Sequence, residues 1–177
     1  VLMLPLSARS GTVTPFGAAL FTATSAVCVT GLVVQDTASY WPGFGQAVIL
    51  LLIQIGGLGV ITVAASFALL SGRKISLMQR SAMQEAIAAP QMGGIVRLTG
   101  FILRMTLTIE VIGALVMLPV FCHDYGARGV WMAVFHSISA FCNAGFDLMG
   151  TKEAPYVSLM GYASHPVINV TIMLLIV

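Results

Sequence analysis

The sequence predicts an all-α integral membrane protein built from repeated units, each containing a helix, a re-entrant pore loop and a second helix. Apolar residues make up 58% of the chain and charged residues 8%, whereas soluble domains carry roughly a quarter charged residues. The stretch 44–70 carries no charge, and its length corresponds to about 40 Å of helix. A short polar-ended motif also occurs twice at a fixed offset, which predicts about one and a half units.

The repeated motif is Ser25–Leu32 with its second copy Ser139–Phe146, offset by 114 residues. Ser, Ala, Cys and Gly coincide in the two copies. Each copy ends a short apolar segment that we predict to be helical, over 15–25 and 130–141. The first of these helices would be about 16 Å long, against roughly 30 Å for the hydrocarbon core. It can therefore enter a bilayer but cannot cross it.

A helix that stops at a glycine inside a membrane leaves carbonyl groups without helical partners. Such backbone is tolerated only where it is buried in protein or lines a water-filled path. Carbonyl oxygens facing such a path can replace the hydration shell of a monovalent cation, as in potassium-channel filters. We therefore predict an ion pore whose filter residues are Cys28, Val29, Thr30, Gly31, Cys142, Asn143, Ala144 and Gly145. The alternative is that both glycines merely allow tight helix packing.

The order of apolar and charged segments predicts the boundaries of two units. Five of the eight basic residues lie between positions 73 and 104, and the positive-inside rule places this connection in the cytoplasm. Both loops then open to the outside of the plasma membrane. The predicted parts are a first unit 1–72 (end of an outer helix 1–6, half-helix and filter 14–32, spanning helix 44–70), a cytoplasmic connection 73–97, and a second unit 98–177 (spanning helix 98–121, half-helix and filter 130–146, final helix 166–177). In the first half-helix, we expect Thr14 to cap a helix that starts at Pro15.

Composition argues against several other classes of protein. A net charge of +2, without a basic run interleaved with aromatics, does not favour nucleic-acid binding. Three widely spaced cysteines suggest neither a zinc site nor a disulfide framework. The chain has no initiator Met and begins and ends within apolar stretches, so we expect it to be a fragment of a longer protein.

Two stretches have competing interpretations. The spacing of apolar residues over 75–87 predicts an amphipathic helix, which would lie on lipid headgroups or dock a cytosolic subunit. The run Gly56–Gly59 resembles a phosphate loop in composition only. Because apolar residues flank it on both sides and no strand precedes it, close helix packing or a kink is the better interpretation.

Two polar residues inside predicted membrane segments are candidates for a functional role. Glu110 is a functional candidate by its position, but we favour a structural ion pair with a basic residue on a helix outside this chain. His136 has no Cys, Asp or Glu at ligand spacing, so we expect a hydrogen-bonded polar group rather than a metal ligand.

Other polar residues lie near the predicted outer surface. Asp36 and Asp147 follow the two motifs and would either concentrate cations at the mouths or be ordinary loop charges. We expect Asp36 to lie beside Tyr40 and Trp41 at the membrane interface. His123, Asp124 and Arg128 are expected in a solvated loop.

Taken together, the motifs resemble a known family along essentially the whole chain. The stretches 24–32, 54–59, 72–76 and 135–147 are similar in order and spacing to the Trk/Ktr/HKT superfamily of potassium transporters. Phe-Cys-Asn-Ala-Gly-Phe-Asp, at 141–147, resembles the bacterial Ktr membrane subunit more than Trk.

The resemblance implies four such units around one K⁺ pathway, embedded in membrane lipid. It also implies a homodimer resting on a cytoplasmic ring of RCK-type nucleotide-binding regulatory subunits. The intramembrane gating loop of the family's third unit is not in this sequence. No covalently bound cofactor is implied; K⁺ is the transported ion, and Na⁺ coupling stays open. Serine at the position of Gly31 accompanies sodium transport in the family.

Alternatives to cation translocation are a membrane-embedded enzyme and a structural subunit of another membrane complex. An enzyme needs a nucleophile or metal with a base beside it, and no motif of that kind is present in the sequence. A structural subunit would not need two glycine-ended half-helices.

Overall fold

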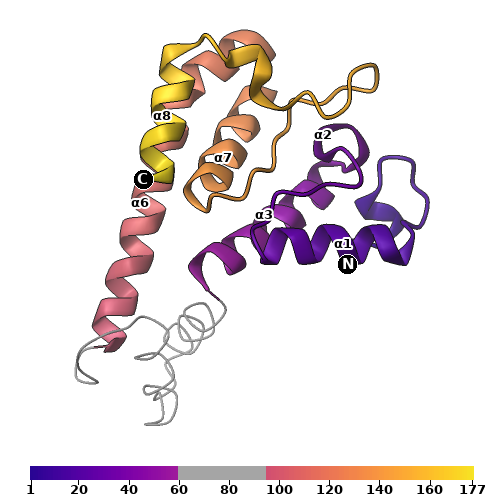
Figure 1. The fold of residues 1–177 in the computed structure, drawn as a ribbon, viewed down its shortest axis with the longest axis horizontal. Helices are drawn as coiled ribbons and strands as arrows, with labels where there is room; N and C mark the ends of the chain where they lie inside the picture. Colours follow the sequence, from indigo (N-terminus) through magenta and orange to yellow (C-terminus); the bar gives the residue numbers. More distant parts are fainter. Residues whose placement is uncertain (60–94) are drawn as a thin grey trace. The chain divides into compact units, whose positions relative to one another are not determined.

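The computed structural model describes residues 1–59 and 95–177. Within these ranges all regular structure is helical and there is no strand, as Figure 1 shows. This agrees with the predicted all-α class. The elements in chain order are η1 (Pro5–Ser7), α1 (Phe16–Val27), α2 (Thr37–Tyr40), α3 (Gly43–Leu58), α6 (Ile95–Tyr125), α7 (Arg128–Phe141), η2 (Ser158–Tyr162) and α8 (Pro166–Ile176).

By its internal contacts, the described chain divides into two compact units. One comprises 1–57 together with 110–177, and the other comprises 58–109. Both copies of the repeated motif therefore belong to the same compact unit. The second unit contains the first part of α6, whereas most of the predicted connection 73–97, including the amphipathic stretch 75–87, lies outside the described residues.

Helix α6 contains the membrane-length segment Thr99–Tyr125, the one helix within the described ranges that is long and apolar enough to cross a bilayer. It extends four residues past the predicted end at 121, so placing His123 and Asp124 in a loop was wrong. Gly126 stops the helix because it adopts a φ of 60°, and its N–H donates to the Cys122 carbonyl at 3.0 Å. This is a left-handed helix end of the kind that glycine favours.

The two predicted half-helices are present as α1 and α7, with 12 and 14 residues. Their lengths of about 18 and 21 Å are well below the thickness of a hydrocarbon core. Helix α7 begins at Arg128 rather than at 130, so Arg128 is helical and not part of a loop. Of the predicted span 44–70, α3 covers the first part, and 60–70 lies outside the described residues. Helix α8 begins at Pro166, as predicted.

Two predictions near the N-terminus are wrong. Residues 1–6 are not the end of an α-helix, since only the short 3₁₀ turn η1 forms there. Leu4 is extended, with a φ of −66° and a ψ of 144°, because a residue that precedes proline avoids the α region. Thr14 does not cap α1: Pro15 occupies the cap position, and the Thr14 hydroxyl instead accepts from the Tyr40 hydroxyl at 3.2 Å.

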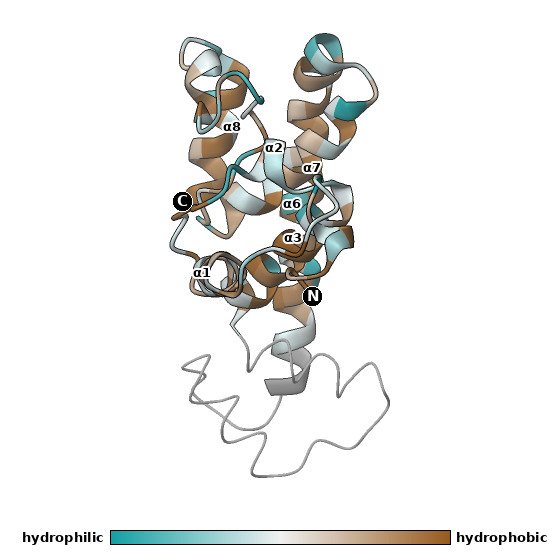
Figure 2. Ribbon diagram, turned by 90° about the vertical axis from the view of Figure 1, so that its right-hand side faces the viewer, coloured by the Kyte–Doolittle hydropathy of each residue, from teal (hydrophilic) through white to brown (hydrophobic). Residues whose placement is uncertain are grey.

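Apolar side chains form the core of the compact unit made of 1–57 and 110–177. Hydrophobic residues dominate α1 and α3 in Figure 2. Trp41 is fully buried in this core. The side chain of Gln46 crosses this core: its amide nitrogen donates to the Trp41 carbonyl at 2.9 Å, and its oxygen accepts from the Trp131 indole at 2.8 Å. These bonds tie α3 to the start of α7.

Helix α7 packs against α8. The short helix η2 precedes α8 in the chain and contacts the end of α6 through Tyr162. The Tyr162 hydroxyl donates to Oδ2 of Asp124 at 2.5 Å. Partial burial, with a smaller contribution from this bond, raises the pKa of Tyr162, so the hydroxyl keeps its proton and stays a donor. The C-terminal helix is thereby anchored to α6.

Candidate functional site

The repeated motifs form two loops with the same backbone conformation. Helix α1 ends at Val27 and α7 at Phe141. In the first loop, Val29 and Gly31 have φ values of 54° and 71°. In the second loop, Asn143 and Gly145 have φ values of 54° and 70°. Left-handed residues thus alternate with ordinary ones at matching positions, and two of the four are not glycine, which is uncommon.

Backbone hydrogen bonds repeat in the same way. The N–H of Thr30 donates to the Ser25 carbonyl at 2.9 Å, and the N–H of Ala144 donates to the Ser139 carbonyl at 2.7 Å. The N–H groups of Cys28 and Cys142 likewise bond to carbonyls four residues earlier, at 2.8 and 2.9 Å. The equivalence predicted from the 114-residue offset therefore holds at the level of individual hydrogen bonds.

The two loops meet at their glycines. A Cβ placed on Gly31 would lie 2.7 Å from the Ala144 carbonyl oxygen and 3.3 Å from the Gly145 Cα. A Cβ on Gly145 would lie 3.5 Å from the Gly31 Cα, an ordinary contact distance. Both positions have a positive φ, which favours glycine, but only Gly31 is also closely crowded.

Helix α3 packs against the ends of both half-helices through adjacent glycines. A Cβ on Gly56 would collide with the Val27 carbonyl at the end of α1. A Cβ on Gly57 would collide with the Cys142 side chain just after α7. Close packing is therefore the role of this glycine pair, as the apolar flanks of Gly56–Gly59 indicated.

Glu110 has a partner within the chain, whereas we expected one on a helix outside it. Its Oε1 accepts from the Gln54 amide nitrogen at 2.9 Å, and the Gln54 amide oxygen lies 3.9 Å from the Cys142 Sγ. Ser137 on α7 donates its hydroxyl to the Glu110 carbonyl at 2.6 Å. The carboxylate is therefore connected through one amide to the start of the second loop.

No sequence motif marks Gln54, although one sequence signal points to it. It is an amide inside the uncharged stretch 44–70, and a buried amide is costly unless it is hydrogen-bonded. That argument predicts a polar partner for Gln54 but cannot say which one.

Asp36 serves as a structural hydrogen-bond acceptor. It is 6% exposed, and its Oδ2 accepts from the Ser39 N–H at 2.7 Å at the start of α2. Its Oδ1 accepts from the Tyr156 N–H at 3.0 Å, and a Cβ on Gly150 would collide with the carboxylate. The Tyr156 hydroxyl also donates to the Val34 carbonyl at 2.9 Å. The segment after the second loop therefore holds the residues that follow the first.

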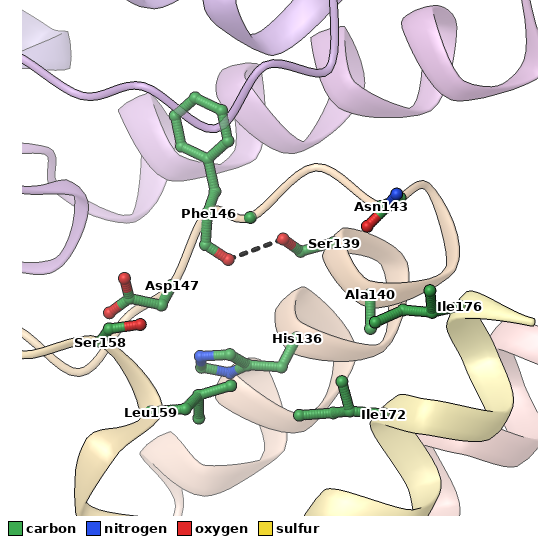
Figure 3. Close-up of a pocket in the computed structure, with 11 residues that line it drawn as sticks. His136, Ser139, Ala140, Asn143, Phe146, Asp147, Ser158, Leu159, Ile172 and Ile176 are labelled. Atoms are coloured by element: carbon green, nitrogen blue, oxygen red, sulfur yellow. Dashed lines mark hydrogen bonds between the residues drawn. The ribbon is translucent and has the colours of Figure 1, made fainter.

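Asp147 is half-buried, and its Oδ1 accepts from the Met149 N–H at 2.9 Å. It lines a cavity of about 140 Å³ beside the second loop, together with His136, Ser139 and Asn143 (Figure 3). His136 is a hydrogen-bonded polar group, as predicted: Nδ1 lies 2.7 Å from the Met132 carbonyl, and Nε2 lies 3.2 Å from the Leu148 N–H.

The chemistry that these loops offer is that of backbone carbonyl groups at the ends of two short helices. In the described ranges no three His, Cys, Asp or Glu side chains gather closely enough to hold a metal ion. Cys28 is exposed and Cys142 is partly buried, and both are free thiols. Of the predicted filter residues, Gly31 lies against Ala144 and Gly145. Asp36 instead accepts a hydrogen bond from the Tyr156 N–H.

Comparison with known proteins identifies relatives over nearly the whole chain. Residues 3–177 match the TrkH family, described as cation transport proteins. The chain is 46% identical, over 85% of its length, to the potassium/sodium uptake protein NtpJ of Enterococcus hirae. It is 41% identical over its full length to the Ktr system potassium uptake protein B of Bacillus subtilis, and 36% identical over 97% to that of Vibrio alginolyticus. It spans 34%, 38% and 36% of the length of these relatives.

Proposed function

Because the chain belongs to the TrkH family of cation transport proteins, we propose that it forms part of a path through which K⁺ enters the cell across the plasma membrane. The observation that carries this proposal is the pair of loops with matching left-handed residues that meet at Gly31 and Gly145. The names of the relatives, which are potassium or potassium/sodium uptake proteins, support the choice of ion.

In this proposal the carbonyl oxygens of residues 28–31 and 142–145 replace water around the ion. Alternating left-handed and ordinary conformations can turn successive carbonyls toward a common axis, as a filter requires. The C-terminal ends of α1 and α7 carry partial negative charge, and each lies directly before a loop. Both features favour a desolvated cation at the glycines without any chemical change to the ion.

The complete assembly is also a proposal. The resemblance suggests four pore units in one polypeptide, of which the domain boundaries 1–72 and 98–177 would represent the first two. The proposed assembly is a homodimer gated by a cytoplasmic RCK-type subunit, and the word "system" in the names of two relatives supports the presence of a further component. A second form of this proposal is sodium-dependent K⁺ uptake, since one relative is named a potassium/sodium uptake protein.

Uptake measurements test the proposed function. Cells that lack their own potassium uptake should accumulate K⁺ or rubidium when they express the complete transporter that carries these residues. Absence of uptake by protein that reaches the membrane would favour the alternative, a structural subunit of another membrane complex.

The topology is tested by reporter fusions. The basic residues at 73–104 predict a cytoplasmic location for Gly72, and two re-entrant loops then require an external location for Lys152. Fusions at these two residues should report opposite sides of the membrane. If both report the same side, the segment 130–145 crosses the membrane completely and is not re-entrant.

A regulatory partner is tested at Arg80, which lies in the amphipathic stretch 75–87. If this stretch docks a cytosolic ring, Arg80→Glu should weaken co-purification of the regulatory subunit severalfold while membrane insertion stays normal. Unchanged co-purification would instead indicate a helix that rests on lipid headgroups.

A further inference from the structure

The exit arm of the second loop, which we define as residues 146–148, is fixed to α7 by two buried side chains. The Ser139 hydroxyl donates to the Phe146 carbonyl at 2.6 Å, as Figure 3 shows. The His136 Nε2 accepts from the Leu148 N–H at 3.2 Å. Residues three apart on a helix share a face, so these two side chains hold the exit arm at two points.

His136 is itself held in one orientation. Its Nδ1 lies 2.7 Å from the Met132 carbonyl, which can only accept, so Nδ1 carries the proton and Nε2 is the acceptor. The ring stacks on Phe121, with 5.2 Å between ring centroids and 27° between planes. The imidazole therefore presents a fixed acceptor to the Leu148 N–H.

The equivalent positions of the first loop, 114 residues earlier, are Thr22 and Ser25, and neither reaches its own exit arm, residues 32–34. The buried Thr22 hydroxyl has no hydrogen-bond partner in the part of the chain that the structure describes. Ser25 bonds to the Thr30 hydroxyl at 2.8 Å, within the loop itself. The bond of Val34 to Tyr156 comes from an exposed segment. The two loops have the same backbone conformation, but only the second exit arm is held by hydrogen bonds from its own half-helix.

We propose that His136 and Ser139 are positioning residues that hold the second loop in its ion-selecting shape, whereas the first loop has no such support from its own half-helix. This inference rests on the proposed function. The exit arm starts directly after Gly145, so a displaced arm moves the carbonyls of Ala144 and Gly145. Ion discrimination should therefore be sensitive to position 136 and insensitive to position 22.

The test compares K⁺ and Na⁺ uptake per transporter in the complete protein. His136→Phe keeps an aromatic ring against Phe121 but leaves the buried Leu148 N–H without an acceptor, which is the costly half of a broken hydrogen bond. We expect the K⁺ to Na⁺ uptake ratio to fall at least about fivefold. His136→Gln supplies an oxygen at similar reach and should restore most of the ratio.

Two further variants complete the comparison. Ser139→Ala should lower the ratio in the same direction, because it removes the donor to the Phe146 carbonyl. Thr22→Val is the matched control: it removes an unpartnered hydroxyl at the equivalent position with little change in shape, and the ratio should stay unchanged.

An unchanged ratio in well-expressed His136→Phe and Ser139→Ala variants would overturn the proposal, as would an equal loss in Thr22→Val. If His136→Phe fails to reach the membrane, Ser139→Ala decides alone, since it removes a single oxygen atom. Gly31→Ser is measured in parallel. A lower ratio there, without any change in the positioning variants, defeats this inference alone; an unchanged ratio there defeats the proposed function, and this inference with it.

Discussion

Replacing Gly31 with serine should lower the ratio of K⁺ to Na⁺ uptake by about an order of magnitude. A side chain at a left-handed residue costs about 1–2 kcal/mol, and a difference of about 1.4 kcal/mol is a factor of ten in an equilibrium constant. The structure adds a second reason, because the new Cβ would lie 2.7 Å from the Ala144 carbonyl oxygen. That carbonyl must move, and selectivity depends on the field and flexibility of such groups.

Gly145→Ser is the matched comparison for this prediction. It has the same left-handed φ, 70°, but its Cβ would meet the Gly31 Cα at 3.5 Å, without crowding. We therefore expect a smaller loss of discrimination than at Gly31. Both uptakes are measured and normalised to transporter protein in the membrane. If serine lowers the yield at both positions but leaves the ratio unchanged, the glycines serve packing only.

The second large effect is expected from Gly56→Ala, and it concerns stability rather than selectivity. The added methyl group would collide with the backbone carbonyl of Val27, which cannot rotate away as a side chain would. Overpacking of this kind costs about 1–3 kcal/mol. We expect a lower membrane yield and a lower thermal stability of the purified transporter. Stability is measured by the loss of the monodisperse peak in size-exclusion chromatography after heating.

Gly43→Ala on the same helix is the control for this prediction. A Cβ at Gly43 meets nothing within 4 Å in the part of the chain that the structure describes. Alanine is a better helix former than glycine by up to about 1 kcal/mol, so stability should be unchanged or slightly higher. Equal stability of the Gly56→Ala and Gly43→Ala proteins would show that α3 does not pack closely on Val27.

Local patterns were sufficient to predict the helical segments and the repeat. Pro166 starts a helix as its fixed φ favours, and the copies Ser25–Leu32 and Ser139–Phe146 have equivalent backbone hydrogen bonds. The predicted end of α6 was wrong because a different residue decides where the helix ends. The charges at His123 and Asp124 suggested an early end for α6, but Gly126 ends the helix because it can adopt the left-handed conformation.

Partners across the fold could not be predicted from local patterns. Glu110 and Gln54 are 56 residues apart in sequence, and Trp131 and Gln46 are 85 residues apart. No periodicity relates such pairs, and only the folded chain brings them together. The same limit applies to His136. The absence of Cys, Asp or Glu at ligand spacing indicated a hydrogen-bonded polar group, but it did not identify Leu148 as the partner.

The bonds from Tyr156 to Asp36 and Val34 make the segments that follow the two loops dependent on each other. The Asp36 carboxylate is accommodated by Gly150 and bound by the Tyr156 N–H. A change at 36 would strand a backbone N–H at 156, and a side chain at 150 would displace the carboxylate. Substitutions in either segment are therefore constrained by the other, so the two segments cannot vary independently.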